Sequence, residues 1–290
     1  MKIAGFTIIR NAIKNDYPVV EAIRSILPVV DEMVVLVGES EDDTEQLIRS
    51  IGSDKIRIHH SVWDPAHFEG GKILAVETDK ALRLISPDAD WAFYIQADEV
   101  IHEKYHTVIR QAAENYLADK RVEGLLFHYT HFYGTYDYVG DSRKWYANEI
   151  RIIRNDPSIH SYRDAQGFRK NGNKLQVKRI AACVYHYGWV KSPKQMMVKN
   201  QNFIEFWQEE KDKKEAYKAQ DIFAFESFDS LDKFKDSHPA VMKERIEKQN
   251  WKITLDISKK QFSLKNRILY WVEKKTGVRL FDYKNYKIIK

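Results

Sequence analysis

Asp90-Trp-Ala-Phe-Tyr-Ile-Gln-Ala-Asp-Glu99 is an apolar run that ends in two adjacent carboxylates. Residues 91–97 have the length and aromatic content of a buried strand. A carboxylate without a compensating charge is costly at a buried strand end, so a bound divalent cation is the natural partner of Asp98. The alternative is that Asp98 and Glu99 cap a helix that follows the strand.

The sequence before this stretch alternates between strand and helix patterns. Apolar, strand-like runs and amphipathic, helix-like segments take turns over residues 3–9, 18–27, 33–37, 43–51, 55–59 and 72–85. Such a series predicts a mostly parallel sheet that helices cover on both faces, with ligands at the carboxyl ends of the strands. The predicted fold class is therefore α/β, with a Rossmann-like sheet.

The pattern changes after a further predicted helix at residues 104–117. Strand-like runs then follow one another at residues 124–132, 149–153 and 176–187, and a charged, helical pattern begins at about residue 193. We therefore predict an α/β domain over residues 1–192 and a helical, basic C-terminal extension over residues 193–290.

Polar residues follow the predicted strands at the edge where a ligand would bind. Arg10 and Asn11 follow the first strand, Glu39 the second, and Gln96 and Asp98 the fourth. Because the carboxyl ends of parallel strands meet at one edge of the sheet, we expect these side chains to surround one site.

Lys72 opens a predicted helix directly after the pair Gly70-Gly71. Exposed backbone N–H groups at a helix start, together with the lysine charge, suit a phosphate group. The alternative is that the two glycines only form a turn.

Four segments resemble family 2 of the nucleotide-sugar-dependent glycosyltransferases. They are Phe6-Thr-Ile-Ile-Arg-Asn11, Val34-Val-Leu-Val-Gly-Glu-Ser-Glu-Asp-Asp-Thr44, Gln96-Ala-Asp98 and Val184-Tyr-His-Tyr-Gly-Trp-Val-Lys-Ser-Pro193. The resemblance implies a GT-A-like fold and the transfer of a sugar from a nucleotide-diphosphate donor to a hydroxyl acceptor. It also implies that Arg10 and Asn11 lie beside the nucleotide, with Glu39 in place of the Asp that usually meets the base.

The resemblance further implies a Mg2+ or Mn2+ ion on the donor diphosphate. In the family an Asp-x-Asp element holds this ion; here Asp98 matches the last Asp, and Gln96 stands in place of the first. His186 matches a histidine that returns to the metal in many such enzymes, and neutral imidazole is a common metal ligand. The alternative is that His186 is a hydrogen-bonded core residue.

The catalytic carboxylate of the family lies in the region that corresponds to residues 145–169. Asp164 is our candidate for the general base that deprotonates the acceptor hydroxyl. Glu149 is the second candidate, although its alternating strand context is equally typical of a surface ion pair. Because no carboxylate attacks the sugar in this scheme, the anomeric centre would invert in one displacement.

The basic charge of the protein is concentrated at its C-terminus. Residues 251–290 carry eleven Lys and Arg against three Asp and Glu, whereas residues 1–250 carry 36 against 39. We expect this tail to contact an anionic membrane surface, where a saccharide or a lipid-linked saccharide would be the acceptor in cell-surface polysaccharide or glycolipid synthesis. The alternative is a tail that packs onto the catalytic domain and leaves its lysines solvated.

The sequence contains one cysteine, Cys183, and no run of about 18 apolar residues. It can therefore form no disulfide within the chain, which favours a reducing compartment. We expect a cytoplasmic enzyme that is peripheral on the inner face of the membrane.

Two other classes of protein compete with this interpretation. A nucleic-acid-binding protein could use Tyr270, Trp271, Tyr283 and Tyr286, which are interleaved with Lys and Arg. The basic charge avoids the α/β half, however, so binding of nucleic acid is disfavoured. A nucleotidyltransferase on a similar sheet is the other alternative, whereas a P-loop kinase lacks its Gly-x-x-x-x-Gly-Lys-Ser/Thr motif here.

Overall fold

The computed structural model describes residues 1–206 and 221–290. The strands of this part are β1 (Ile3–Ile9), β2 (Glu32–Gly38), β3 (Ile56–Ser61), β4 (Trp91–Tyr94), β5 (Glu99–Ile101), β6 (Gly124–Tyr133), β7 (Thr135–Gly140), β8 (Asn148–Arg154), β9 (Ile159–Tyr162), β10 (Gly167–Lys170), β11 (Asn173–Lys174), β12 (Gln176–Trp189), β13 (Leu231–Lys233) and β14 (Lys287–Ile288). Its α-helices are α1 (Val19–Ile26), α2 (Thr44–Arg49), α3 (Lys72–Arg83), α4 (His106–Asn115), α5 (Pro193–Phe203), α7 (Lys243–Glu247) and α8 (Leu264–Thr276). Short 3-10 turns are η1 (Pro65–His67), η2 (Glu69–Gly71), η3 (Glu103–Tyr105), η4 (Ile204–Phe206) and η5 (Ala240–Met242).

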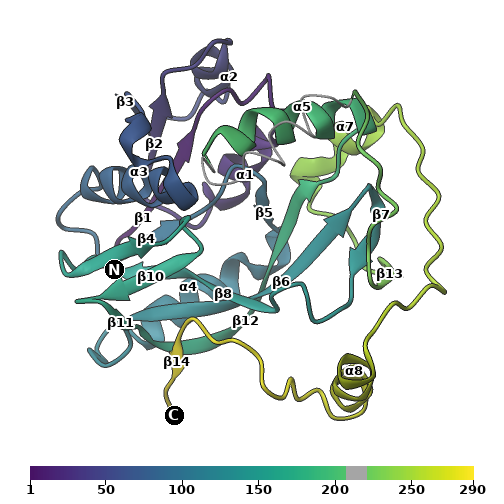
Figure 1. Cartoon of the computed structure of the whole chain (residues 1–290). Helices are drawn as coiled ribbons and strands as arrows, with labels where there is room; N and C mark the ends of the chain where they lie inside the picture. The colour runs from purple at the N-terminus through teal and green to yellow at the C-terminus, as the bar shows by residue number, and fades with distance from the viewer. Residues whose placement is uncertain (207–220) are drawn as a thin grey trace.

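The first four strands form a parallel sheet in the order β4-β1-β2-β3 (Figure 1). Successive residues of β1 enter opposite layers: Ile3 packs in the core with α1 and α4, and Ala4 packs in the core with α3. Burial on both faces explains why these strands are apolar without alternation. The predicted α/β class, with a parallel sheet of four strands flanked by helices, is confirmed.

The second half of the sheet contains antiparallel strands. β8 pairs with β4, and β6 pairs with β8 and β7 on one edge and, in parallel, with β12 on the other. β12 also pairs with β5, whose residue Glu99 lies opposite His186. This register brings the end of the β4 segment and the middle of β12 together. A separate three-stranded sheet, β11-β10-β9, carries the loop that contains Asp164.

The C-terminal part of the chain also contributes to the main sheet. β13 pairs with β7, and β14 pairs with β12. The segment for which we predicted a helical extension therefore contains two short strands besides α5, α7 and α8, while its residues 207–220 lie outside the described part. Among the described residues, no helix is both long and apolar enough to cross a bilayer.

The fourth strand ends three residues earlier than its apolar run predicts. β4 stops at Tyr94, and a turn follows in which the Glu99 backbone N–H donates to the Gln96 carbonyl at 3.1 Å. The Gln96 N–H donates in return to the Glu99 carboxylate at 3.1 Å. The chain then continues as β5, so the alternative in which Asp98 and Glu99 cap a helix is wrong.

Candidate functional site

A cleft of about 1020 Å³ lies at the carboxyl ends of β1 and β4. Six of the residues that we predicted for the site line it, namely Arg10, Asn11, Gln96, Asp98, Asp164 and His186. Glu149, the second candidate base, also lines the cleft. Glu39 and Lys72 are not among its lining residues.

Asp98 is the centre of a compact charged group. Its Oδ2 accepts a hydrogen bond from Lys199 Nζ at 3.3 Å and lies 3.7 Å from His186 Nε2. Burial alone would raise the pKa of Asp98, but nearby positive charge, chiefly that of Lys199, outweighs burial and holds it at about 2. Asp98 is therefore ionised at neutral pH.

Gly188 leaves the space that this arrangement needs. A Cβ atom at this position would lie 2.5 Å from Asp98 Oδ2 and 2.8 Å from His186 Nε2. Both distances are shorter than van der Waals contact, so a side chain at this position would displace the carboxylate or the imidazole.

A chain of hydrogen bonds fixes the tautomer of His186. Nε2 of His131 lies 2.9 Å from the Tyr146 carbonyl oxygen, so it carries a proton and donates it. Burial lowers the pKa of His131 to about 3, so this ring is neutral and its Nδ1 is an acceptor. Nδ1 of His186, 3.3 Å away, must therefore be the donor.

The consequence is that Nε2 of His186 carries a lone pair. Burial lowers the pKa of His186 as well, which keeps this ring neutral. The lone pair faces the ionised Asp98 at 3.7 Å, and two facing acceptors are stable only with a cation between or beside them. Lys199 places one positive charge beside Asp98. The lone pair of His186 is still without a cation, so a second positive charge can bind there.

Asp98 and His186 fit a divalent cation. A carboxylate and a neutral imidazole are ligands for Mn2+, and a ligating imidazole usually donates its other N–H to a fixed acceptor, as His186 does to His131. In the part of the chain that the structure describes, no group of three or more His, Cys, Asp or Glu side chains could hold a metal. Water molecules or oxygen atoms of a bound ligand would complete the coordination of such a cation, as is usual for Mg2+.

Glu99, the neighbour of Asp98, has a different role. Its side chain is fully buried and forms two hydrogen bonds with Arg151, of 2.8 and 2.7 Å. Tyr129 donates a third at 2.6 Å. Because all its bonds are to the protein, Glu99 holds β5 and β8 together and is not free to bind a ligand.

At the β1 end of the cleft, Arg10 and Asn11 connect neighbouring loops. Arg10 Nε donates to the backbone carbonyl of Glu39 at 2.8 Å, and Asn11 Oδ1 accepts from the Glu41 N–H at 2.7 Å. Asn11 has a positive φ of 54°, a conformation that Asn tolerates better than most residues. The Arg10 guanidinium lies 5.9 Å from the ring of Trp63, which also lines the cleft. Glu39 thus contacts Arg10 through its backbone.

Lys72 begins α3, as the sequence predicts, after Gly70 and Gly71 at φ values of 58° and 70°. These left-handed conformations explain why two glycines stand here. Lys72 itself is exposed. Its contact with a phosphate stays a prediction.

Two carboxyl groups of the cleft differ in their ability to act as a base. Asp164 is half-buried and lies between Arg163 and Ala165, which both have positive φ values, of 56° and 62°. The side-chain amide of Gln96 donates a long hydrogen bond of 3.5 Å to the Ala165 carbonyl and so ties this loop to the β4 end. Non-glycine residues with positive φ are strained, and such strain is typical of functional loops.

Glu149 is buried, and its Oε2 has no hydrogen-bond partner among the described residues. Burial raises its pKa to about 8, although Arg151 acts in the opposite direction. Glu149 is therefore mostly protonated at neutral pH, which makes it a poorer general base than a half-exposed carboxylate.

Sequence reasoning missed Lys199 and His131. Lys199 lies in α5, among many lysines, and nothing in the local pattern separates it from solvated ones. His131 lies opposite His186 in the β6–β12 register, which only the paired strands reveal.

No family model and no curated protein sequence matches the chain. Among solved structures, it is similar to S. aureus TarS, with 16% identity over 70% of this chain and 39% of that one and a TM-score of 0.39. It is also similar to glucosyl-3-phosphoglycerate synthase from Mycobacterium tuberculosis in complex with Mn2+, uridine diphosphate and phosphoglyceric acid, with 21% identity over 46% of this chain and 43% of that one and a TM-score of 0.30. The chain spans less than two thirds of the length of either protein.

Proposed function

We propose that the protein is a glycosyltransferase that moves a sugar from a nucleotide-diphosphate donor to a hydroxyl acceptor. The observation that carries the proposal is the pairing of an ionised Asp98 with the lone pair of His186 in a large cleft at the carboxyl ends of a parallel sheet. A cleft in which Asp98 and His186 can hold a cation is suited to a diphosphate rather than to an apolar ligand.

In this proposal Asp98 and His186 hold a divalent cation, Mg2+ or Mn2+. The bound cation would act as a Lewis acid that neutralises the departing diphosphate. Lys199 contributes a second positive charge on the same side of the cleft. Arg10 and Asn11 bind the nucleotide end, next to the largely buried ring of Trp63.

Asp164 takes the proton of the acceptor hydroxyl as the hydroxyl oxygen attacks the anomeric carbon. The bond from that carbon to the diphosphate oxygen breaks in the same displacement, so the configuration inverts. Glu149 contributes an uncharged carboxyl group that can donate a hydrogen bond to the sugar. The acceptor, in this proposal, is a saccharide or lipid-linked saccharide at the cytoplasmic side of a membrane.

The first test is a thermal-shift screen of nucleoside diphosphates in the presence and absence of Mg2+ or Mn2+. A ligand that binds only the folded state raises the melting temperature by mass action. We expect one diphosphate to stabilise the protein strongly only when the cation is present. If no diphosphate does so with either cation, the proposal is wrong; if one does, NMR of the products made from its sugar conjugates identifies the bond and its anomeric configuration.

A further inference from the structure

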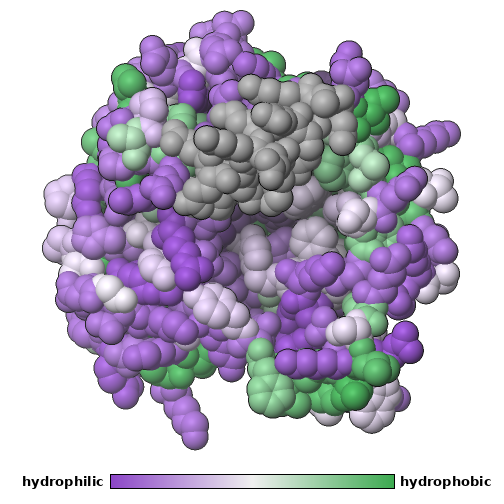
Figure 2. Space-filling view, viewed as in Figure 1, coloured by the Kyte–Doolittle hydropathy of each residue, from purple (hydrophilic) through white to green (hydrophobic). Residues whose placement is uncertain are grey.

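Helix α8 exposes its apolar side to solvent. Leu264, Ile268 and Trp271 recur at helical spacing and so share one face, and their side chains are 79%, 64% and 61% exposed. In Figure 2, hydrophobic side chains gather over the region where Figure 1 shows α8. An ordinary surface helix turns this stripe toward the core.

The opposite side of α8 attaches to the protein through polar contacts. Tyr270 donates a hydrogen bond of 2.6 Å to Asp141, and Glu273 pairs with Arg143 at 2.9 Å. These contacts fix the orientation of the helix, so its apolar face cannot turn inward without breaking them. The exposure of this face is therefore a property of the folded chain.

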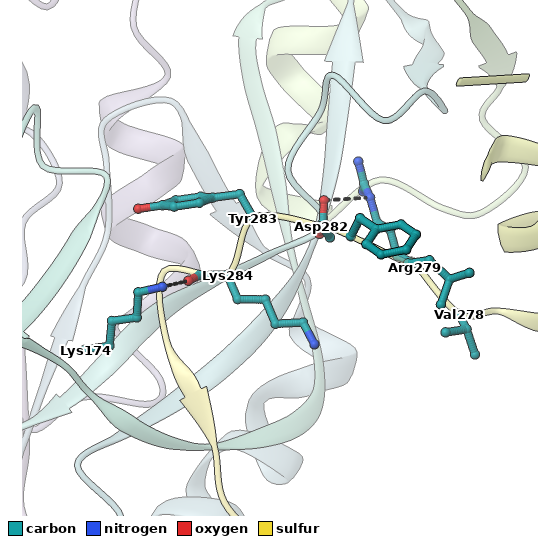
Figure 3. Close-up of a pocket in the computed structure, with 8 residues that line it drawn as sticks. Lys174, Val278, Arg279, Asp282, Tyr283 and Lys284 are labelled. Carbon is teal, nitrogen blue, oxygen red and sulfur yellow. Dashed lines mark hydrogen bonds and ion pairs between the residues drawn. The ribbon is translucent and has the colours of Figure 1, made fainter. Parts of the chain in front are cut away.

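The segment that follows α8 in the chain also carries exposed apolar side chains. Val278, Leu280 and Phe281 are 52%, 41% and 88% exposed. Phe281 has a positive φ of 56°, which is unusual for a bulky residue. Arg279 holds the segment by donating to the Trp145 carbonyl at 2.7 Å and by pairing with Asp282 at 3.2 Å (Figure 3).

We define the outward patch as the six exposed apolar residues of α8 and the segment that follows it: Leu264, Ile268, Trp271, Val278, Leu280 and Phe281. A group of this size, contributed by two adjacent segments, is larger than the single apolar side chains normally scattered over a surface.

Positive charge surrounds the outward patch. Lys265, Arg267 and Lys275 are exposed on α8, and none of them forms an ion pair with another residue in the described part of the chain. A shallow cavity of about 530 Å³ beside Phe281 is lined by Lys174 and Lys284 as well (Figure 3). The patch thus combines apolar groups with cations at its rim.

We propose that the outward patch docks the protein onto an anionic lipid bilayer, with α8 lying in the plane of the interface. Apolar side chains enter the boundary between headgroups and acyl chains, while the surrounding lysines and arginines meet the acidic headgroups. A second copy of the chain would bring like charges together, and a nucleic acid would leave the aliphatic side chains of Leu264 and Ile268 without a partner. An anionic bilayer can accept the apolar side chains and the surrounding positive charges at the same time.

The outward patch lies next to the cleft along the chain. Asp282 and Tyr283, which directly follow Phe281, both line the cleft. Docking would therefore place the opening of the cleft near the lipid surface. On the proposed function, which this step requires, the acceptor is a saccharide linked to a lipid, and its sugar reaches the cleft while its lipid stays in the bilayer.

The test is co-sedimentation of the full chain with phosphatidylcholine vesicles that contain or lack phosphatidylglycerol, at low and at high ionic strength. We expect binding to the anionic vesicles that weakens with salt. The double variant Ile268→Gln/Trp271→Gln should bind at least about 100-fold more weakly, because two side chains no longer enter the bilayer. Its melting temperature should not change, since both side chains are exposed.

A control variant tests whether the loss of binding is specific to the outward patch or follows from removing any exposed apolar side chains. Val62→Gln/Ile222→Gln removes two side chains that are 70% and 65% exposed elsewhere, and should bind like the unaltered protein.

A second pair of variants does the same for charge. Lys265→Gln/Lys275→Gln should weaken binding on the order of 30-fold and reduce its salt dependence. Lys243→Gln/Lys248→Gln, which removes the same charge from α7 and the residue that follows it, should leave the binding unchanged.

Failure of the unaltered chain to bind anionic vesicles at low salt would overturn the docking proposal. So would equal binding by the Ile268→Gln/Trp271→Gln variant, or a dimer in sedimentation equilibrium that this variant abolishes. Nucleoside diphosphate binding is measured on the same proteins without vesicles. If the unaltered chain binds a nucleoside diphosphate but no anionic vesicles, the docking proposal alone is refuted. If it binds the vesicles but no nucleoside diphosphate, the proposed transferase is refuted.

Discussion

Replacement of Asp98 by Asn should weaken both the fold and the binding of a cation. The positive charge of Lys199 overcomes the effect of burial and holds the pKa of Asp98 at about 2, against an ordinary value of 3.8. Each pKa unit corresponds to about 1.4 kcal/mol, so the ionised carboxylate stabilises the folded state by about 2 kcal/mol at neutral pH. For a chain of this length, Asp98→Asn should lower the melting temperature by about 4 °C.

The sign of the pH dependence follows from the depressed pKa. The stabilising effect of Asp98 is fully present above the pKa of the unfolded chain, near 3.8, and is lost as the pH falls toward 2. The difference in unfolding free energy between the two proteins should therefore be constant from neutral pH down to about pH 5 and should shrink below about pH 4. Urea denaturation at a series of pH values measures this difference.

The same variant tests the cation site. Without the carboxylate, calorimetry should detect no Mn2+-dependent increase in the affinity for a nucleoside diphosphate, although the protein remains folded. Asp88→Asn, which removes an exposed carboxylate paired with Lys2 at 2.8 Å, is the control and should change neither property. Unaltered stability of Asp98→Asn at neutral pH would refute the electrostatic argument, and unaltered Mn2+-dependent binding would refute the cation site.

Three further changes test other groups of the cleft. Asp164→Asn should reduce the turnover number on the order of 100-fold or more while leaving nucleotide affinity unchanged, because a general base acts on the acceptor; near-normal turnover excludes Asp164 as the base. Burial raises the pKa of Glu149 and favours its protonated form in the folded state, so the unaltered protein should lose stability as the pH rises toward about 8. Glu149→Gln should not show this loss; parallel denaturation profiles of the two proteins would contradict the assignment. His131→Leu should lower the Mn2+ affinity of the nucleotide complex about 10- to 100-fold without affecting nucleotide binding in the absence of metal, because Nδ1 of His186 loses its acceptor; equal Mn2+ affinity would show that the tautomer of His186 is fixed in another way.

The parallel half of the fold could be predicted from the sequence alone. Strands such as β1 and β2 are continuous apolar runs, and the helices between them carry an apolar stripe. Both patterns are local. A strand that is buried on both faces is apolar throughout, and a helix that is buried on one face has apolar residues at helical spacing, so each can be recognised within a single segment. The position of Arg10 directly after β1 was predictable for the same reason, whereas β4 stops at Tyr94, three residues before the end of its apolar run.

The sequence also determined where the positive charge lies, but only the tertiary structure decided which way α8 faces. The spacing of Leu264, Ile268 and Trp271 indicates one apolar face whether that face is buried or exposed. Its orientation depends on the contacts of Tyr270 and Glu273 with residues about 130 positions earlier in the chain.

The roles of adjacent carboxylates were decided in the same way. Asp98 and Glu99 are adjacent carboxylates that the sequence alone does not tell apart. In the structure, Arg151 of β8 forms an ion pair with Glu99, whereas Lys199 of α5 and His186 of β12 lie beside Asp98. The register between β12 and its partners β5 and β6 sets these encounters, and that register joins segments separated by more than 50 residues. Local periodicity shows which face of a strand is buried, but the strand beside it is selected by the packing of the whole chain.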